Sequence, residues 1–417
     1  MSDQYGKNHD EGINDKPLPQ KESGHGVPEE ELALAQPGRK KGLYSFFSSL
    51  MAILAGLAVG VIILLVANPS NAGKGLLAIL RGGMTGSPTA FGQAIATSIP
   101  IIMTGLSVAF AYKAGLFNIG ASGQFMIGGV FAVYVAIKGT FIPASVLWLV
   151  CMLAAMVGGA IWGAVPGILK AYFKVNEVIT SIMMNYIGMY TTKIIIERTI
   201  YDSRYARAQN VPLRAQIPTL GLNTRFPGTN LNISLLLCIV FCLIIFIISS
   251  RTVFGFELTA VGLNPDASRY AGINSKRTVI TAMIISGALS GLGAYMMYLG
   301  GTGVYMDIKE IVAAQGFNGI PVALLAMNHP IGVFFTGLFI GHITIGGENL
   351  QLFGYSKEII DMIIAVIIYC AAFSLIFKQL LSRIIQGRLN SKRQKLRGPA
   401  PQGPGSYTQP EETEVSS

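Results

Sequence analysis

The residues best suited to polar chemistry in this sequence form one run between two strongly apolar segments. The run Gly115–Gln124 holds three glycines, the amides Asn118 and Gln124, and the hydroxyl of Ser122. An amide without a hydrogen-bond partner costs roughly 2–7 kcal/mol in hydrocarbon. Irregular backbone at membrane depth persists only where protein buries it or where it lines a water-filled cavity. We therefore interpret the run as a broken or re-entrant element that lines a polar pathway, with a close helix–helix contact through the glycines as the alternative.

Two further stretches place polar and aromatic side chains inside apolar runs. Asn185 and Tyr186 lie two turns inside one of them. Phe317 and Asn318 stand within Gln315–Pro321, which we expect to interrupt a span, and they repeat the Phe-Asn pair of the first run. Paired breaks in the two halves of a chain indicate a transporter site. The predicted pathway residues are Phe117, Asn118, Gln124, Asn185, Tyr186, Phe317 and Asn318.

Glu177 allows two interpretations. With Thr180, Ser181 and Met184 it recurs at helical spacing, and a polar stripe on a spanning helix usually faces the interior of the bundle. Alternatively, Glu177 caps the amino end of a helix, where the helix dipole favours a carboxylate.

Several kinds of chemistry have no motif in this sequence. A phosphate-binding loop of the form G-x-x-x-x-G-K-[ST] is absent, so we expect no ATP hydrolysis by this chain alone. No His, Cys or carboxylate cluster has metal spacing, and no serine elbow or carboxylate pair stands out. Charges in the middle of the apolar runs are scarce, which argues against a proton relay. We therefore expect no cofactor on this chain and an energy source elsewhere.

The composition indicates that membrane-spanning helices position these residues. Of 417 residues, 51% are hydrophobic and only 12% are charged, against about 25% charged in soluble domains. A membrane-spanning helix needs about 20 apolar residues. The predicted fold is therefore all-α, a polytopic membrane protein with about ten transmembrane helices that include broken or re-entrant elements. The candidate spans are about 44–67, 92–112, 119–137, 143–168, 178–197, 231–249, 277–300, 309–327, 330–347 and 358–378.

The charge pattern predicts the orientation and the domain boundaries. The net charge is +10, and the basic residues lie in loops between spans, which argues against a nucleic-acid partner and fits Lys and Arg kept on the cytoplasmic side of a bilayer. We expect residues 1–41 to be a disordered cytoplasmic tail, 42–380 the membrane domain and 381–417 a second cytoplasmic tail. Both termini would then be cytoplasmic.

The loop at 254–277 has the features of a docking element. Asn264 suits a helix cap and Pro265 the first turn, so a short helix of small residues from Ala267 to Gly272 should follow. Such a helix could dock into a groove on a soluble partner. An ordinary surface helix is the alternative.

Four segments together resemble the permease subunits of bacterial ABC importers, in the branch that carries nucleosides and is allied to simple-sugar and branched-chain amino acid permeases. These segments are 105–129, 176–187, 261–273 and 316–330. The resemblance implies alternating access in the bacterial cell membrane, a second related permease, a cytoplasmic ATPase that holds ATP and magnesium, and an extracellular substrate-binding lipoprotein. It also implies an ATPase-coupling role for Val261, Gly262, Asn264, Pro265, Ala267, Tyr270, Ala271 and Gly272.

The same resemblance bears on the substrate. Sugar permeases carry an aspartate where this chain has Asn118, which favours nucleosides, whereas the nucleoside branch usually carries a glutamate where this chain has Ser122. Aromatic faces and amides suit the stacking and hydrogen bonding of a nucleoside. The alternatives are a simple sugar or another small polar solute, an ion-coupled secondary transporter, and a membrane sensor or scaffold without transport.

Overall fold

The computed structural model describes residues 38–301, 304–308 and 310–373. Most of the expected amino-terminal tail, the whole of the expected tail at 381–417 and the end of the tenth candidate span therefore lie outside the described residues. Contacts divide the chain into a unit that ends at Leu43 and a unit that starts at Tyr44. Of the first unit only the beginning of helix α2 is described, and the helices from Tyr44 onward belong to the second.

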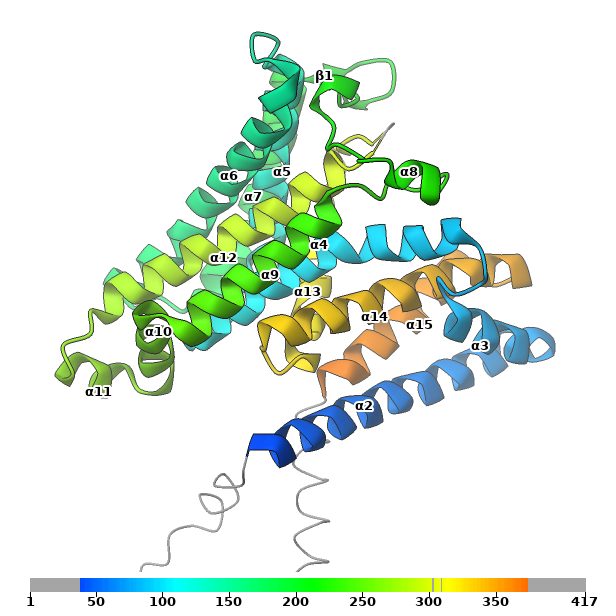
Figure 1. Cartoon of the computed structure of the whole chain (residues 1–417), viewed down its shortest axis with the longest axis horizontal. Coiled ribbons are helices and arrows are strands. Elements are labelled where there is room, and N and C mark those ends of the chain that lie inside the picture. Colours follow the sequence, from blue (N-terminus) through cyan, green and yellow to red (C-terminus); the bar gives the residue numbers. More distant parts are fainter. Residues whose placement is uncertain (1–37, 302–303, 309, 374–417) are drawn as a thin grey trace, which may run out of the picture. The chain divides into compact units, whose positions relative to one another are not determined.

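Each of the ten candidate spans contains a helix (Figure 1). The helices are α2 (Gly38–Ala67), α4 (Pro88–Lys113), α5 (Ala121–Lys138), α6 (Ala144–Phe173), α7 (Glu177–Thr199), α9 (Ser234–Arg251), α12 (Ser275–Tyr298), α13 (Ala314–Leu325), α14 (Pro330–Glu348) and α15 (Lys357–Ala372). In the described part of the chain, seven helical segments are long and apolar enough to cross a membrane. They are 50–67, 88–113, 121–138, 144–173, 234–251, 275–298 and 330–353. The predicted all-α, polytopic membrane fold is confirmed.

Shorter elements connect these helices. Among the described residues the strands are two short segments that pair antiparallel, with Tyr201 opposite Ala208. The short elements are η1 (Pro69–Asn71), α3 (Ala72–Arg81), β1 (Tyr201–Asp202), β2 (Arg207–Ala208), η2 (Leu213–Ala215), α8 (Leu222–Arg225), α10 (Val253–Leu263), α11 (Pro265–Tyr270) and η3 (Asn349–Phe353).

Helix α12 forms the centre of the packing because its small residues let three neighbours approach. It runs along α6 and also contacts α4 and α5. A Cβ built on Gly159 of α6 would lie 2.2 Å from the carbonyl oxygen of Gly287 in α12. One built on Gly291 would lie 2.2 Å from the carbonyl oxygen of Ala155. The small residues of the Ser286–Gly291 run therefore place the two backbones in direct contact.

Helix α13 corrects two expectations about the second half of the chain. It has 12 residues, a length of about 18 Å, which is too short for the complete span predicted at 309–327. The run Gln315–Pro321 does not interrupt a helix but lies inside α13, and most of the preceding stretch from Leu299 to Ala313 is irregular where it is described. The glycines of this run allow α13 to pack closely against α4 and α5, and they do not interrupt the helix.

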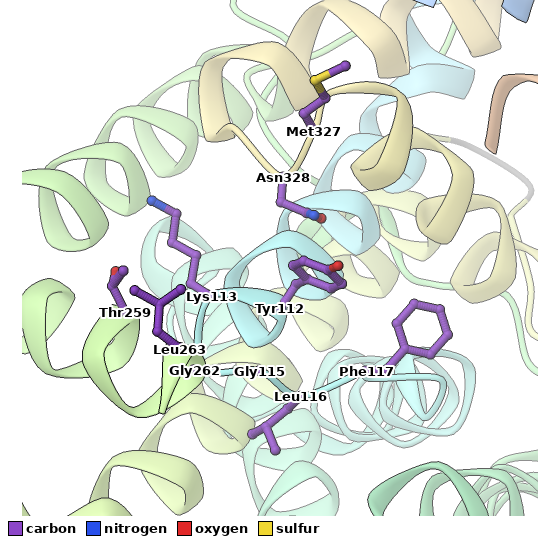
Figure 2. A pocket seen from close by; sticks show the side chains of 10 residues that line it. All are labelled: Tyr112, Lys113, Gly115, Leu116, Phe117, Thr259, Gly262, Leu263, Met327 and Asn328. Carbon is purple, nitrogen blue, oxygen red and sulfur yellow. The ribbon is translucent and has the colours of Figure 1, made fainter. Parts of the chain in front are cut away.

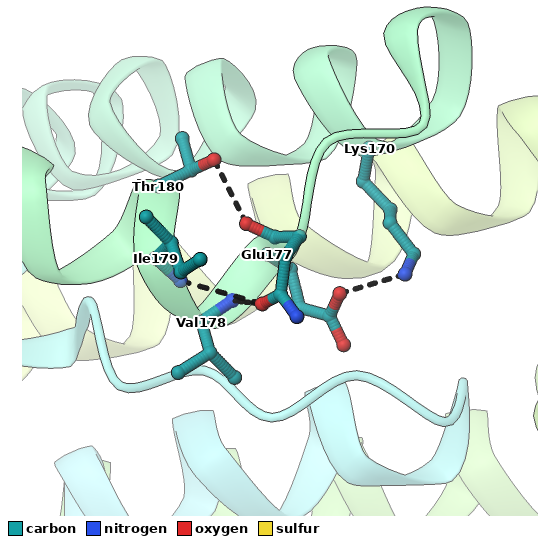
Figure 3. Close-up of polar contacts among 6 residues, drawn as sticks. Lys170, Glu177, Val178, Ile179 and Thr180 are labelled. Carbon is teal, nitrogen blue, oxygen red and sulfur yellow. Dashed lines mark hydrogen bonds and ion pairs between the residues drawn. The ribbon is translucent and has the colours of Figure 1, made fainter.

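The corner between α6 and α7 shows what Glu177 does (Figure 3). The amide oxygen of Asn176 accepts hydrogen bonds from the backbone N–H groups of Val178 (2.9 Å) and Ile179 (3.4 Å), so Asn176 caps α7. Glu177 forms an ion pair of 2.7 Å with Lys170, in the first turn where the helix dipole also favours a carboxylate. The rest of the predicted stripe, Thr180, Ser181 and Met184, is buried.

The contact between α6 and α12 generates a stability prediction. Gly287→Ala should destabilise the protein by about 1–3 kcal/mol, the usual range for overpacking, because the new methyl group would meet backbone atoms that cannot rotate away. The matched control is Gly73→Ala in α3, where a Cβ meets nothing within 4 Å. Thermal unfolding in detergent measures both. Equal melting temperatures for the two variants would contradict the proposed backbone contact.

Candidate functional site

Residues 114–120 form an irregular segment, which we call the break, between α4 and α5. Gly115 has φ +72°, a conformation that glycine adopts without steric cost. The N–H of Leu116 bonds the carbonyl oxygen of Ala111 (3.2 Å), and that of Ile119 bonds the carbonyl of Phe117 (3.0 Å). The polar run therefore does interrupt the helices, although its last four residues, Ala121–Gln124, already belong to α5.

The amides of the run form a closed hydrogen-bonded cluster with two serines. The Asn118 Nδ2 group donates to Gln124 Oε1 (2.8 Å) and to Ser286 Oγ (2.7 Å), while Gln124 Nε2 donates to Asn118 Oδ1 (3.2 Å). Ser107 Oγ lies 2.9 Å from Ser286 Oγ. All four side chains are at most 1% exposed. The cluster joins the break to α4, α5 and α12, and each amide finds its partner inside the protein.

Asn185 joins the break to a further helix, α7. Its Oδ1 accepts a hydrogen bond from the N–H of Gly123 (2.8 Å), and its Nδ2 donates to the carbonyl oxygen of Ile119 (3.0 Å). The side chain is 2% exposed. A buried backbone group without a partner is costly, so Asn185 satisfies two such groups where the helical pattern is missing.

The amino-terminal ends of α5 and α13 meet beside the break. Ser122 Oγ donates to the carbonyl oxygen of Ala313 (2.9 Å), and Thr104 Oγ1 of α4 donates to that of Gln315 (2.9 Å). A Cβ on Gly316 would lie 2.3 Å from the Cα of Ser122. The two helices, one from each half of the chain, thus begin in contact with each other.

The structure divides the seven predicted pathway residues into two sets. Asn118, Gln124 and Asn185 are buried and bonded within the protein. The others reach the surface of this chain: Tyr186 is 51% exposed, Phe317 is 40% exposed, and Phe117 and Asn318 are partly exposed. Phe317 and Asn318 lie in α13 and not in a break, so their resemblance to Phe117 and Asn118 is one of sequence and not of local structure.

A cavity of about 450 Å³ opens beside the break (Figure 2). Lys113 and Phe117 line it from α4 and the break, and Thr259 lines it from α10. Asn328, in the turn between α13 and α14, contributes an Oδ1 atom that is buried and has no hydrogen-bond partner among the described residues. The cavity therefore lies where the break, α10 and the α13–α14 turn meet.

His329 follows this turn and caps α14. Its Nδ1 accepts a hydrogen bond from the N–H of Gly332 (3.4 Å), which requires a ring without a proton on that nitrogen. Burial, and secondly the positive charge of Lys113, lower the pKa of His329 from its ordinary value. Because the folded pKa lies below the unfolded one, this group contributes stability above about pH 6.5 that is lost as the pH falls toward the folded pKa.

The end of α10 touches the break through backbone atoms. A Cβ on Gly262 would lie 2.3 Å from the carbonyl oxygen of Lys113 and 2.8 Å from the nitrogen of Gly115. Every side chain larger than hydrogen would push the two segments apart. The break therefore moves with the end of α10 or is held by it.

The predicted coupling residues separate into an inner and an outer set around this contact. Val261 is 2% exposed, and Gly262 packs on the break. Beyond them the chain turns outward into α11, and Asn264 caps α11 by accepting from the N–H groups of Asp266 (3.1 Å) and Ala267 (3.0 Å). A short helix does follow Asn264, but it spans Pro265–Tyr270, so Ala271 and Gly272 lie beyond its end and the expected bounds of Ala267 to Gly272 were wrong. The outer set is exposed and consists of Asn264, Pro265, Ala267, Tyr270, Ala271 and Gly272.

Sequence reasoning missed several residues of this site. Ser286 accepts a hydrogen bond from Asn118, and Ser290 Oγ donates to the carbonyl oxygen of Ala121 (2.6 Å). The signal was the presence of hydroxyls in an apolar run, which need internal acceptors. Within the described residues no group of His, Cys, Asp or Glu could hold a metal ion. The arrangement is therefore suited to holding a polar segment of backbone in one conformation.

The closed cluster generates a prediction. Asn118→Ala should destabilise the protein by about 1–3 kcal/mol, because Gln124 and Ser286 would each lose a buried partner. The control is Asn318→Ala, the other Phe-Asn asparagine, which is partly exposed and should change stability little. Thermal unfolding of both variants in detergent provides the comparison. A melting temperature for Asn118→Ala as high as that of the control would show that the cluster does not hold the break.

Comparison with known proteins reveals relatives along most of the chain. The family described as "Branched-chain amino acid transport system / permease component" matches residues 91–372. The guanosine ABC transporter permease protein NupP of Bacillus subtilis is 36% identical over 84% of this chain and 99% of its own length. The nucleoside ABC transporter permease protein NupB of Lactococcus lactis is 36% identical over 80% of this chain and 92% of its own. A second guanosine permease protein of the same Bacillus, NupQ, is 27% identical over 61% of this chain and 81% of its own.

No solved structure matches the chain. The family match extends from the start of α4 to the end of α15. It therefore includes the break, the amide cluster, the coupling segment and α13. The chain belongs to the family of permease components typified by branched-chain amino acid transport systems.

Proposed function

We propose that this permease subunit carries nucleosides as part of an ABC importer, with the break as the element that moves. The observation that carries the proposal is the backbone contact between Gly262 of α10 and Lys113–Gly115. It connects an exposed surface helix, α11, to the polar segment of the membrane domain. A partner that shifts α11 would shift the break directly.

We infer the partners of this subunit from the arrangement of the coupling residues and from the names of the relatives. The names NupP and NupQ belong to two guanosine permease proteins of one organism, which supports pairing with a second, related permease. We place the ATPase, with its ATP and magnesium, against the outer coupling set around Ala267 and Tyr270, the latter 95% exposed. That surface and both termini are then cytoplasmic, and a substrate-binding lipoprotein delivers the nucleoside on the opposite side.

The candidate pathway amides take a positioning role in this proposal. Asn118, Gln124 and Asn185 keep the break in shape in the conformation seen here, since their hydrogen bonds are made within the protein. Phe117, Tyr186, Phe317 and Asn318 reach the surface and remain available to a substrate or to the second permease.

Uptake in proteoliposomes tests the function. The chain, the second permease, the ATPase and the binding lipoprotein are reconstituted together, and labelled guanosine and uridine are supplied outside with ATP inside. We expect nucleoside uptake that requires ATP and resists competition by ribose. Uptake by this chain alone under a proton or sodium gradient would identify a secondary transporter instead, and competition by ribose as strong as that by nucleosides would point to a sugar permease.

Two variants of the coupling residues distinguish binding of the ATPase from transmission of its movement to the break. Ala267→Trp places a bulky ring on the exposed outer set and should abolish co-purification of the ATPase. Gly262→Ala should leave the ATPase bound yet lower uptake roughly 2- to 30-fold, the usual range for a residue that carries coupling, because its methyl group would displace the break. Gly73→Ala serves again as the control. Normal uptake by Gly262→Ala would remove the backbone contact from the mechanism.

A further inference from the structure

Helix α7 presents one stripe of side chains to the surface of the chain. Its opposite face is buried and carries Ser181, Asn185 and Thr192, whereas Tyr186 is 51% exposed and Tyr190 is 49% exposed. At 3.6 residues per turn, the stripe keeps within about 80° of the helix circumference. It consists of Ile179, Met183, Tyr186, Tyr190, Lys193 and Glu197, and three isoleucines that are 36% to 51% exposed, Ile182, Ile187 and Ile194, flank it on both sides.

The two tyrosines of this stripe lie at the middle of the helix. Tyr186 is nine residues after the first residue of α7 and Tyr190 is nine residues before the last, so each lies about 14 Å from the nearer end. Tyrosines in membrane proteins gather at the two interfaces, where the hydroxyl meets water. Neither hydroxyl has a hydrogen-bond partner among the residues that the structure describes. Two central tyrosines of this kind do not suit a face that lies against lipid.

A pair of charges extends the same stripe. Lys193, on the turn after Tyr190, forms an ion pair with Glu310. The lysine side chain is 31% exposed and the glutamate side chain 52% exposed, and Lys193 lies about 9 Å inside the end of the helix. Charged pairs at such depth face a bundle interior or a water-filled cavity. Glu310 also stands shortly before α13, which exposes Phe317, so the pair ties the stripe to the second half of the chain.

We infer that this stripe lines the water-filled translocation pathway, and that Tyr186 and Tyr190 are substrate-binding residues that stack the base of the nucleoside. The inference rests on the proposed function, because it assigns the base-recognition step to this face. The two rings are one turn apart on one face, so a base that leaves the first can meet the second. Stacking tolerates every base, since each has a π-face, and the polar Lys193–Glu310 end keeps water in contact with the entering ribose.

Kinetics of the reconstituted importer test the stacking role. Leucine keeps the apolar bulk and removes the ring, whereas phenylalanine keeps the ring and removes only the hydroxyl. Tyr186→Leu and Tyr190→Leu should each raise the KM for guanosine and uridine about tenfold, within the range that loss of one base–aromatic stack produces. Tyr186→Phe and Tyr190→Phe should stay within about twofold of the wild type, because the stacking face is unchanged. Co-purification with the ATPase confirms that each variant assembles.

Labelling of single cysteines tests the water-filled pathway without requiring any substrate. Tyr190→Cys in the assembled complex should react with a membrane-impermeant maleimide. Leu153→Cys on α6 is the matched control, since Leu153 is 56% exposed and also lies nine residues from the start of its helix. It should stay unlabelled in lipid, as should the parent chain. All variants carry Cys370→Ala, because Cys370 is only partly buried whereas Cys151, Cys238 and Cys242 are buried.

The outcomes separate the two proposals. A wild-type complex that carries no nucleoside overturns the proposed function and with it the assigned ligand, while the labelling still decides whether the stripe meets water. Nucleoside uptake with wild-type KM in both leucine variants overturns the stacking role. Absence of labelling at Tyr190→Cys, with the complex intact, overturns the placement of the stripe on the pathway.

Discussion

Inside a membrane, a backbone segment without helical hydrogen bonds must find its partners within the protein. The break at 114–120 is subject to this constraint, and buried side chains of the surrounding helices supply the hydrogen-bond partners that it needs. Asn118 bonds Gln124 and the serines of α4 and α12, and Asn185 bonds one backbone group of the break and one in the first turn of α5. Polar side chains that would be costly in lipid thus become the means by which an irregular segment is kept in one conformation.

The break lies between the exposed helix α11 and the interior of the membrane domain, two regions whose movements must be linked in a transporter. On one side Gly115 touches Gly262, whose helix leads into the exposed α11. On the other side α5 follows the break directly, and its Ser122 touches Gly316 at the start of α13. Both contacts use glycine, and neither leaves room for a side chain that could absorb a displacement. In the proposed function, a movement at α11 would reach the starts of α5 and α13 through backbone contacts, without a chain of flexible side chains between them.

Sequence periodicity and composition predicted the membrane fold, because long apolar segments and a shortage of charge have few other solutions. The polar break was also predictable, since three glycines and two amides conflict with a lipid-facing helix. The sequence did not reveal that Gln315–Pro321 continues as a helix, because glycines permit both a break and a close contact, and only the neighbour decides. The hydrogen-bond partners of the buried amides could not be predicted from the sequence either. Asn118 and Ser286 are separated by 168 positions, and no local pattern specifies that they meet. The exposure of Tyr186 beside the burial of Asn185 follows from how α7 packs on α5, which is a tertiary property.

Hydrogen–deuterium exchange of the assembled importer tests most directly whether the break and the coupling segment move together. Peptides that cover 114–124 and 261–273 are compared with the ATPase empty and with the ATPase trapped in its ATP-bound state. The account predicts that ATP binding changes the exchange of both peptides, because Gly262 and the break share a backbone contact. A change at 261–273 with unaltered exchange at 114–124 would contradict it.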